Sequence, residues 1–164
     1  VTEEDLTASE IVNTWDEANI ADIIYGYGDE RYSRRIAKSI VESRPIKTTF
    51  ELVEAIKLGT PNAYHRGRIH PATRTFQALR ITVNDEINTL KEGLRKGFEA
   101  LNPGGRMAVI SFHSIEDRVT KRFCNETERE ATILTKKPIV PSDEEKVRNP
   151  RSRSAKLRII EKKI

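Results

Sequence analysis

The sequence predicts an α/β fold in which a helical block precedes the last helices and strands of an open sheet. In the first part of the chain, apolar side chains recur at helical spacing. A run of consecutive apolar residues, 107 to 110, then follows Asn102-Pro103-Gly104-Gly105, as is typical of a buried strand. A further helix and two more strand candidates come next. This order of elements is that of an α/β sheet.

Caps and breakers define the first two helices. Thr7 and Ser9 are candidate N-caps of a short helix that ends at Trp15. A second helix follows, and we expect it to stop where Gly26 and Gly28 interrupt the pattern. Its inward side chains are Ile20, Ile23 and Ile24.

Two more helices complete the block. Asp29 is the candidate cap of the third helix, which ends before Pro45. Thr48 or Thr49 begins the fourth, which ends at Gly59, and a loop then continues to residue 71. The inward side chains that we predict here are Ile36, Ile40 and Val41 in the third helix and Phe50, Val53 and Ile56 or Ala55 in the fourth.

The strongest periodic signal predicts one long amphipathic helix. Its apolar residues are spaced three or four apart: Phe76, Leu79, Val83, Ile87, Leu90, Leu94, Phe98 and Leu101. The Pro-Gly-Gly turn ends this helix, and we expect Gly105 to need a positive φ there.

The strand at residues 107 to 112 is apolar on successive positions, so we expect both of its faces to be covered, as in a parallel sheet. Further strands are predicted at 131–135 and 156–164, with a polar loop between them that carries an acidic run, 143–145. A doubly wound sheet usually has about five or more strands. The chain therefore predicts only part of a sheet, with an open edge that favours self-association, for example as a homodimer.

Polar residues crowd the end of the first strand. Ser114 and Asp117 have the spacing of a helix capping box, with Glu116 near the helix dipole and His113 packed beside them. The alternative is the rim of an active site, because ligands of open α/β sheets bind beyond the carboxyl ends of the strands. On that interpretation Ser111, His113 and Ser114 contact the ligand.

Charge favours a polyanionic partner without requiring one. The 164 residues carry a net charge of +4 and are 33% charged. The clearest basic segment contains no acid and consists of Arg148, Arg151, Arg153, Lys156 and Arg158. It is either a phosphate-binding loop or a solvated linker. A second basic stripe, Arg31 to Lys38, is balanced by nearby acids.

Several classes of protein are disfavoured. A single cysteine, Cys124, excludes an internal disulfide and fits the reducing cytoplasm. No stretch approaches the roughly 18 apolar residues of a membrane span. The three histidines lie in no metal-ligand spacing, so we expect no metal.

Six segments carry a resemblance to a known family. They are ASEIVN (8–13), YGDERYSRRIAKSIV (27–41), HPATRTFQALRITVNDEI (70–87), LNPGGRMAVISFHSIEDRVTKRF (101–123), LTKKPI (134–139) and NPRSRSAKLR (149–158). In this order they resemble the bacterial ribosomal RNA small-subunit methyltransferase H family, also called MraW.

The resemblance implies methyl transfer from S-adenosylmethionine to the exocyclic amine of a cytidine in small-subunit ribosomal RNA. It also implies a Rossmann-like domain that carries a helical insertion. Residues 1–70 would be that inserted, substrate-recognising domain, and residues 71–164 would be the C-terminal part of the methyltransferase domain.

The resemblance also gives a role to the polar face of the long helix. Arg74, Arg80 and Asn84 would line the RNA or active-site cleft, or else would tie the helical block to the sheet, with Arg80 paired to a carboxylate. Arg151, Arg153 and Lys156 are the candidate RNA contacts of the basic segment. No catalytic residue is assigned beyond the candidate rim at the strand end.

The sequence lacks three motifs that the resemblance leads us to expect. They are the glycine-rich cofactor loop, the acidic residue that binds the ribose and the Asp-Leu-Gly-containing catalytic motif, and no G-x-G-x-x-G occurs. We therefore expect a C-terminal portion of such an enzyme, inactive alone, and assign it no cofactor-binding residue. The alternatives are a non-catalytic basic RNA-binding module and a related methyltransferase that acts on another nucleic acid.

Overall fold

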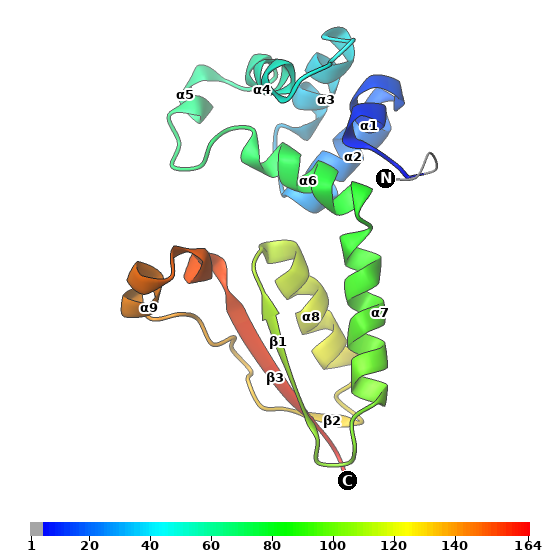
Figure 1. Ribbon diagram of the computed structural model, residues 1–164, viewed down its shortest axis with the longest axis vertical. Helices are drawn as coiled ribbons and strands as arrows, with labels where there is room; N and C mark the ends of the chain where they lie inside the picture. The colour runs from blue at the N-terminus through cyan, green and yellow to red at the C-terminus, as the bar shows by residue number, and fades with distance from the viewer. Residues whose placement is uncertain (1–4) are drawn as a thin grey trace. The chain divides into compact units, whose positions relative to one another are not determined.

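The structure, a computed structural model that describes residues 5–164, divides into two compact units after Glu86. Figure 1 shows the elements of both in chain order. The domain boundary predicted from the sequence lies earlier, at residue 70. The assignment of residues 1–70 as an inserted domain stays a prediction. In the part of the chain that the structure describes, no helix is both long and apolar enough to cross a membrane.

The first unit is entirely helical. Its helices are α1 (Ala8–Thr14), α2 (Glu17–Gly28), α3 (Ser33–Glu42), α4 (Thr49–Leu58), α5 (Asn62–His65) and α6 (Thr73–Val83). Isoleucines from four of them form the centre of the core, and each is fully buried: Ile11, Ile20, Ile24, Ile36, Ile40 and Ile56. This core explains the helical spacing of apolar residues in the sequence.

Two of the predicted caps are confirmed. The Thr7 hydroxyl accepts a hydrogen bond from the Glu10 amide at the start of α1. Thr48 forms a capping box with Glu51. The Thr48 hydroxyl accepts from the Glu51 amide, and the Glu51 carboxylate accepts from the Thr48 amide. These bonds satisfy amides that a helix cannot satisfy itself.

Three details of the helical prediction are wrong. The helix α2 continues through Gly26, and Asp29 is its left-handed C-cap, with φ 49°, rather than the N-cap of α3. An aspartate tolerates this conformation because its short side chain bonds locally. Phe50 is 82% exposed, whereas Leu52 and Ala55 face inward. The predicted loop also contains the short helix α5.

The predicted single helix is two helices, α6 and α7 (Glu86–Glu99). Asp85 adopts a φ of 46°, so the backbone leaves the helical conformation beside Asn84. The interruption is so short that the apolar spacing of the sequence continues across it. Periodicity alone therefore misses the break.

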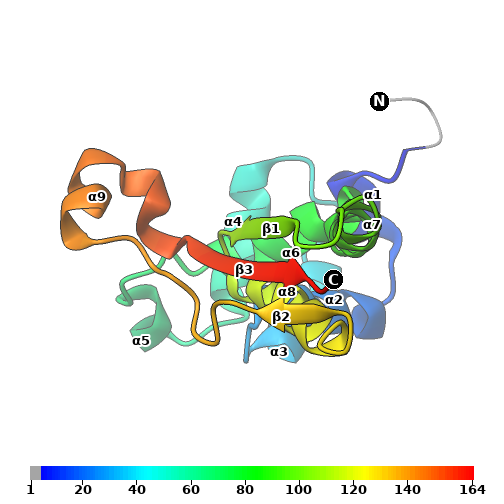
Figure 2. The ribbon, with the colours of Figure 1, turned by 90° about the horizontal axis from the view of Figure 1, so that it is seen from below.

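The second unit is built on a three-stranded sheet. Its elements after α7 are β1 (Arg106–Ser111), α8 (Ser114–Glu126), β2 (Ala131–Ile133), α9 (Asp143–Arg148), the 3-10 helix η1 (Pro150–Ser154) and β3 (Lys156–Lys162). The strand order is β1-β3-β2, and β3 is antiparallel to both neighbours. Figure 2 shows β3, the last strand in the chain, between the other two. The acidic run that was predicted as loop begins α9, which Ser142 caps.

The expected parallel neighbour of β1 is wrong, because β3 is antiparallel to it, and the described residues cover only one face of the strand. Exposure alternates along it, as in an antiparallel strand with one covered face. Met107 packs with Phe98 and Ile160 in the core of the second unit. Ile110, on the opposite face, is 58% exposed. The face of the sheet that carries Ile110 is called the bare face below.

The turn before β1 also differs from the prediction. The positive φ, 77°, belongs to Gly104 and not to Gly105. Gly105 is needed for another reason, because a Cβ there would lie 2.8 Å from the carbonyl oxygen of Asn102. That same carbonyl accepts the Gly105 amide, which holds the turn closed.

The glycines of α2 allow a matched test of packing. Gly28→Ala should lower the free energy of unfolding by about 1–3 kcal/mol, since its Cβ would lie 2.7 Å from the Arg74 carbonyl oxygen on α6. Gly26→Ala is the control, because its Cβ would meet nothing within 4 Å, and alanine should add up to about 1 kcal/mol of helix propensity. Urea unfolding followed by circular dichroism measures both, and equal effects would contradict the close contact of α2 and α6.

Candidate functional site

The end of β1 and the start of α8 bring together the three predicted rim residues. Ser111 is buried, and its hydroxyl donates a long hydrogen bond, 3.4 Å, to the Lys156 carbonyl oxygen. His113 is the N-cap of α8, and Ser114 is the first residue of the helix and exposed. Ser114 and Phe112 therefore face solvent at this strand end, whereas the His113 side chain is 12% exposed.

A capping box occupies the turn between β1 and α8. The His113 Nδ1 accepts from the Glu116 amide at 3.3 Å, and the Glu116 carboxylate accepts from the amides of Phe112 and His113 at 2.8 and 3.3 Å. The predicted box of Ser114 and Asp117 is thus wrong by one position. The Nδ1 atom of His113 takes the place of the Ser114 hydroxyl, which the sequence pattern predicted as the capping group.

Asp117 has a different role, as the shared partner of two cations. Its carboxylate oxygens lie 2.7 Å from the Arg158 Nε and 2.9 Å from the Lys156 Nζ, so α8 is linked to β3. Burial alone would raise the pKa of Asp117, but the hydrogen bonds from Arg158 and Lys156 hold it below its usual value. Lys156, a predicted RNA contact, is therefore already part of an ion pair.

Arg80 and Asn84 lie together on the rim of an apolar groove of about 400 Å³ in the first unit. Val12, Leu52 and Leu79 are among the side chains that form it. The Arg80 guanidinium pairs with both carboxylate oxygens of Glu86, at 2.8 and 3.1 Å, and the Asn84 amide donates to the same carboxylate. The carboxylate partner that the sequence left open for Arg80 is thus Glu86.

Arg74 belongs to another pocket, together with Arg31, Arg68 and two tyrosines. The rings of Tyr32 and Tyr64 meet edge to face at 5.2 Å. The Arg31 guanidinium lies 4.7 Å from the centre of the Tyr32 ring, a favourable cation–π distance. This cluster of three arginines and two tyrosines is called the Arg–Tyr cluster below.

A buried carboxylate anchors the Arg–Tyr cluster. Glu30 is fully buried and accepts hydrogen bonds from the Tyr64 hydroxyl and the Tyr32 amide. Burial, with the hydrogen bond to Glu30, raises the pKa of Tyr64 to about 12, so the phenol stays protonated. Arg74 donates to the Asp29 carbonyl oxygen at 2.9 Å and is held beside them.

The basic segment of the sequence lies mainly on η1. Arg151 and Arg153 are exposed there, and neither has an ion-pair partner among residues 5–164. Ser152 between them is buried and bonds to the Asn149 carbonyl oxygen, which fixes the turn. These two arginines remain open to a ligand, unlike Lys156.

Comparison with known proteins identifies the family. A family model described as the MraW methylase family matches residues 1–163. The chain belongs to the MraW methylase family. The Nostoc punctiforme ribosomal RNA small subunit methyltransferase H is 57% identical over 97% of this chain and 53% of its own length.

Other relatives in this family bear the same name. The Synechococcus elongatus protein is 56% identical over 96% of this chain and 53% of its own length. The Crocosphaera subtropica protein is 53% identical over 98% of this chain and 51% of its own length. The chain thus spans about half the length of these MraW relatives. Their names give no support to the alternative of a non-catalytic RNA-binding module.

The Arg–Tyr cluster was missed because its members come from two distant segments. The sequence predicted Arg74, Arg80 and Asn84 as lining one cleft, whereas Arg74 and Arg80 line different pockets. One signal was available. Residues 61–74 contain three arginines and two histidines but no acid, which is typical of a surface that faces an anion.

Stability at acid pH should depend on Asp117. A carboxyl whose pKa is lowered by folding stabilises the fold at neutral pH, and this contribution is lost as pH falls from its usual value of 3.8 through the folded value. Asp117→Asn should therefore lower the free energy of unfolding at pH 7 by about 3 kcal/mol. It should also flatten the fall in stability below about pH 4.

Asp143→Asn is the matched control for this measurement. Asp143 also pairs with a lysine, at 2.9 Å, but its side chain is 97% exposed, so urea unfolding should change little at either pH. An Asp117→Asn variant as stable as the parent at pH 7 would contradict a stabilising role of the shared carboxylate.

Proposed function

We propose that this chain is part of an enzyme that methylates a cytidine of small-subunit ribosomal RNA at its exocyclic amine, with S-adenosylmethionine as the methyl donor. The observation that carries the proposal is the match of nearly the whole chain to the MraW family and to relatives named for this ribosomal substrate. Such a substrate places the enzyme in the cytoplasm.

The topology of the second unit supports a Rossmann-like methyltransferase domain. Since β3 is antiparallel to both β1 and β2, these two strands run in the same direction and α8 connects them. A strand, a helix and a second strand in the same direction make the βαβ unit of doubly wound sheets. We infer that the chain supplies the C-terminal end of such a sheet.

The bare face of the sheet also supports a larger domain. Ala108 and Ile110 on β1 are exposed, and the outer edge of β1 has no strand beside it among the described residues. Sheets that contain βαβ units are normally covered on both faces. We infer that a further segment of the enzyme, whose relatives are about twice as long as this chain, extends the sheet beyond β1 and covers this face.

The turn after β1 does not have the features by which strand-end turns of this fold class bind nucleotides, so it does not fit S-adenosylmethionine. Such turns use glycines and free backbone amides to approach a ligand closely. Here the turn contains no glycine, and the Glu116 carboxylate accepts both of its amides. We therefore propose that a segment outside residues 5–164 binds the cofactor.

The chain itself would bind and orient the RNA. Methyl transfer to an amine depends mainly on holding the nitrogen in line with the methyl group. The exposed Ser114 hydroxyl lies where a strand-end ligand would lie, and as a hydrogen-bond acceptor it would orient the cytidine amine. The His113 ring cannot do the same, because its Nδ1 already accepts the Glu116 amide. The Arg–Tyr cluster and the η1 arginines, Arg151 and Arg153, would contact phosphates or stack on bases. Arg80 and Asn84 already bond the Glu86 carboxylate, so we propose that they shape the rim of their apolar groove.

The reaction itself is the first test. The full-length protein, given S-adenosylmethionine and undermethylated small ribosomal subunits, should add the mass of one methyl group to a cytidine, as read by mass spectrometry of the RNA. An unchanged RNA mass would overturn the proposal. Methylation of a different nucleic acid would indicate a related enzyme with another substrate. As a control, this chain alone should show no heat of S-adenosylmethionine binding.

The RNA surfaces are tested by the salt dependence of binding. Arg151→Ala combined with Arg153→Ala should weaken binding of a single-stranded RNA and lower the slope of log affinity against log salt by about one to two. Arg95→Ala is a control, because Arg95 is exposed and already paired with Glu99. Fluorescence anisotropy at several salt concentrations gives the slopes. An unchanged slope would contradict phosphate contacts on η1.

A further inference from the structure

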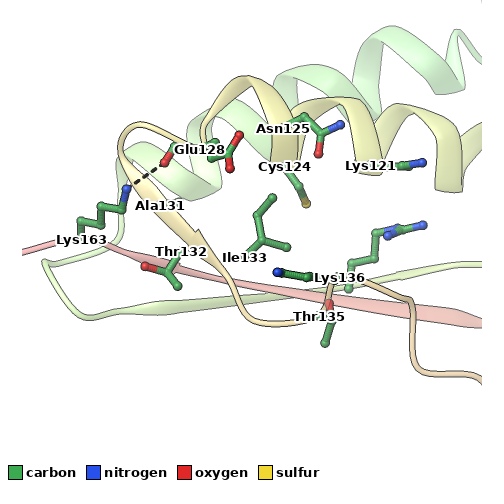
Figure 3. A pocket seen from close by; sticks show the side chains of 11 residues that line it. Lys121, Cys124, Asn125, Glu128, Ala131, Thr132, Ile133, Thr135, Lys136 and Lys163 are labelled. Carbon is green, nitrogen blue, oxygen red and sulfur yellow. Dashed lines mark hydrogen bonds between the residues drawn. The ribbon is translucent and has the colours of Figure 1, made fainter.

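A second-unit pocket of about 430 Å³ lies between α8, β2, β3 and the segment that follows β2. Figure 3 shows it from close by, with Lys121 and Asn125 on α8 and Lys136 beyond β2. Its volume is within the roughly 300–1,000 Å³ range of small-molecule sites. Four cationic side chains line it but only one carboxylate, that of Glu128.

The most informative lining residue is Arg158. Its side chain is 92% buried, yet its guanidinium gives only Nε to a protein acceptor, Asp117. The two terminal nitrogens make no hydrogen bond with any residue from 5 to 164. These two nitrogens are not sealed inside the protein, so their four N–H hydrogens are open to a ligand in the pocket.

The charge around Arg158 is not balanced. Asp117 carries one negative charge and is shared with Lys156, so the three side chains together keep a positive charge. Lys121 and Lys136 form no ion pair in the described structure and reach the same pocket. A group with negative charge and several acceptor oxygens would pair with Arg158, Lys121 and Lys136 together.

Neutral donors complete the pocket. The Thr135 hydroxyl accepts the Ile159 amide at 2.8 Å, which leaves its hydrogen to donate. The Asn125 amide also lines the pocket. Cys124 adds no charge, because burial raises the pKa of its thiol. The arginine fork matches phosphate oxygens, and a phosphate group offers more acceptor oxygens and more negative charge than a carboxylate.

We propose that this pocket binds one phosphate group, with Arg158 at its base and Lys121 and Lys136 at its rim. The phosphate belongs either to an RNA backbone or to a free phosphate compound. The site is independent of methyl transfer, so a failure of the proposed reaction would leave it untouched.

Inorganic phosphate is the first probe. It should shift the backbone amide signals of residues 132–136 of the 164-residue chain, in a saturable way, in two-dimensional NMR spectra. Sodium chloride at matched ionic strength should not. Lys136→Ala and Lys121→Ala should each weaken binding up to about fivefold, whereas Lys137→Ala, the exposed neighbour that does not line the pocket, should change nothing.

Arg158→Lys tests the base of the pocket. It keeps a cation beside Asp117 but removes the terminal nitrogens, so phosphate affinity should fall about tenfold or more. Urea unfolding checks that the variant is folded. If Arg158→Lys should unfold, the two lysine variants still decide. Equal weakening by Lys136→Ala and Lys137→Ala, or shifts that chloride reproduces, would overturn the proposal.

A labelled single-stranded oligouridylate separates the two sources of the phosphate. If an RNA backbone supplies it, the double variant of Lys121→Ala and Lys136→Ala should lower the salt slope of RNA binding by about one to two. If inorganic phosphate binds but the slope stays constant, the ligand is a free phosphate compound, and the site stands. Binding of neither probe would overturn the proposal.

Discussion

The shared carboxylate of Asp117 is the link on which most of the second unit depends. It holds α8 to β3 through two cations, and β3 supplies every ladder hydrogen bond of the three-stranded sheet. The position of α8 fixes two regions. The strand-end turn lies at the start of the helix, and residues nearer its end form a wall of the proposed phosphate pocket. One ion pair therefore connects the two regions of this unit for which we propose a ligand.

Pairing decides which basic residues are open to RNA. Arg80 and Lys156 have the composition and place in the sequence expected of RNA contacts, yet each lies against a carboxylate. Arg151 and Arg153 lie on an exposed 3-10 helix with no such partner among the described residues. Charge along a sequence shows where cations gather, but only the fold shows which of them a distant acid has already neutralised.

The sequence predicted the features that depend on neighbouring residues. The caps at Thr7 and Thr48 and the three strands follow from local chemistry, and all are present. The missed features depend on a conformation or on a distant partner. Asp85 breaks a helix whose periodicity continues, and His113 replaces the serine that the capping pattern favours. The antiparallel β3 could not be inferred, because nothing in β1 encodes the direction of its neighbour.

The candidate site was predicted to a similar extent. The pattern of polar and basic residues located the strand end and the basic segment, since both are continuous in sequence. The Arg–Tyr cluster and the phosphate pocket each join segments that are far apart in the chain, so no sequence window contains them. Arg158 illustrates the difference. In the sequence it is one more basic residue, and only its burial beside Asp117 shows its unused donors.

The place of β3 in the sheet has a consequence for biosynthesis. β1 and β2 are made first but do not pair with each other, because β3 lies between them. Until residues 156–162 leave the ribosome, both strands lack β3 as a neighbour and Asp117 lacks its cations. The first unit, complete by Glu86, can fold while the chain is still being translated. The nascent second unit instead exposes apolar strands until late in translation, which makes this interval the one in which the chain most needs protection from aggregation.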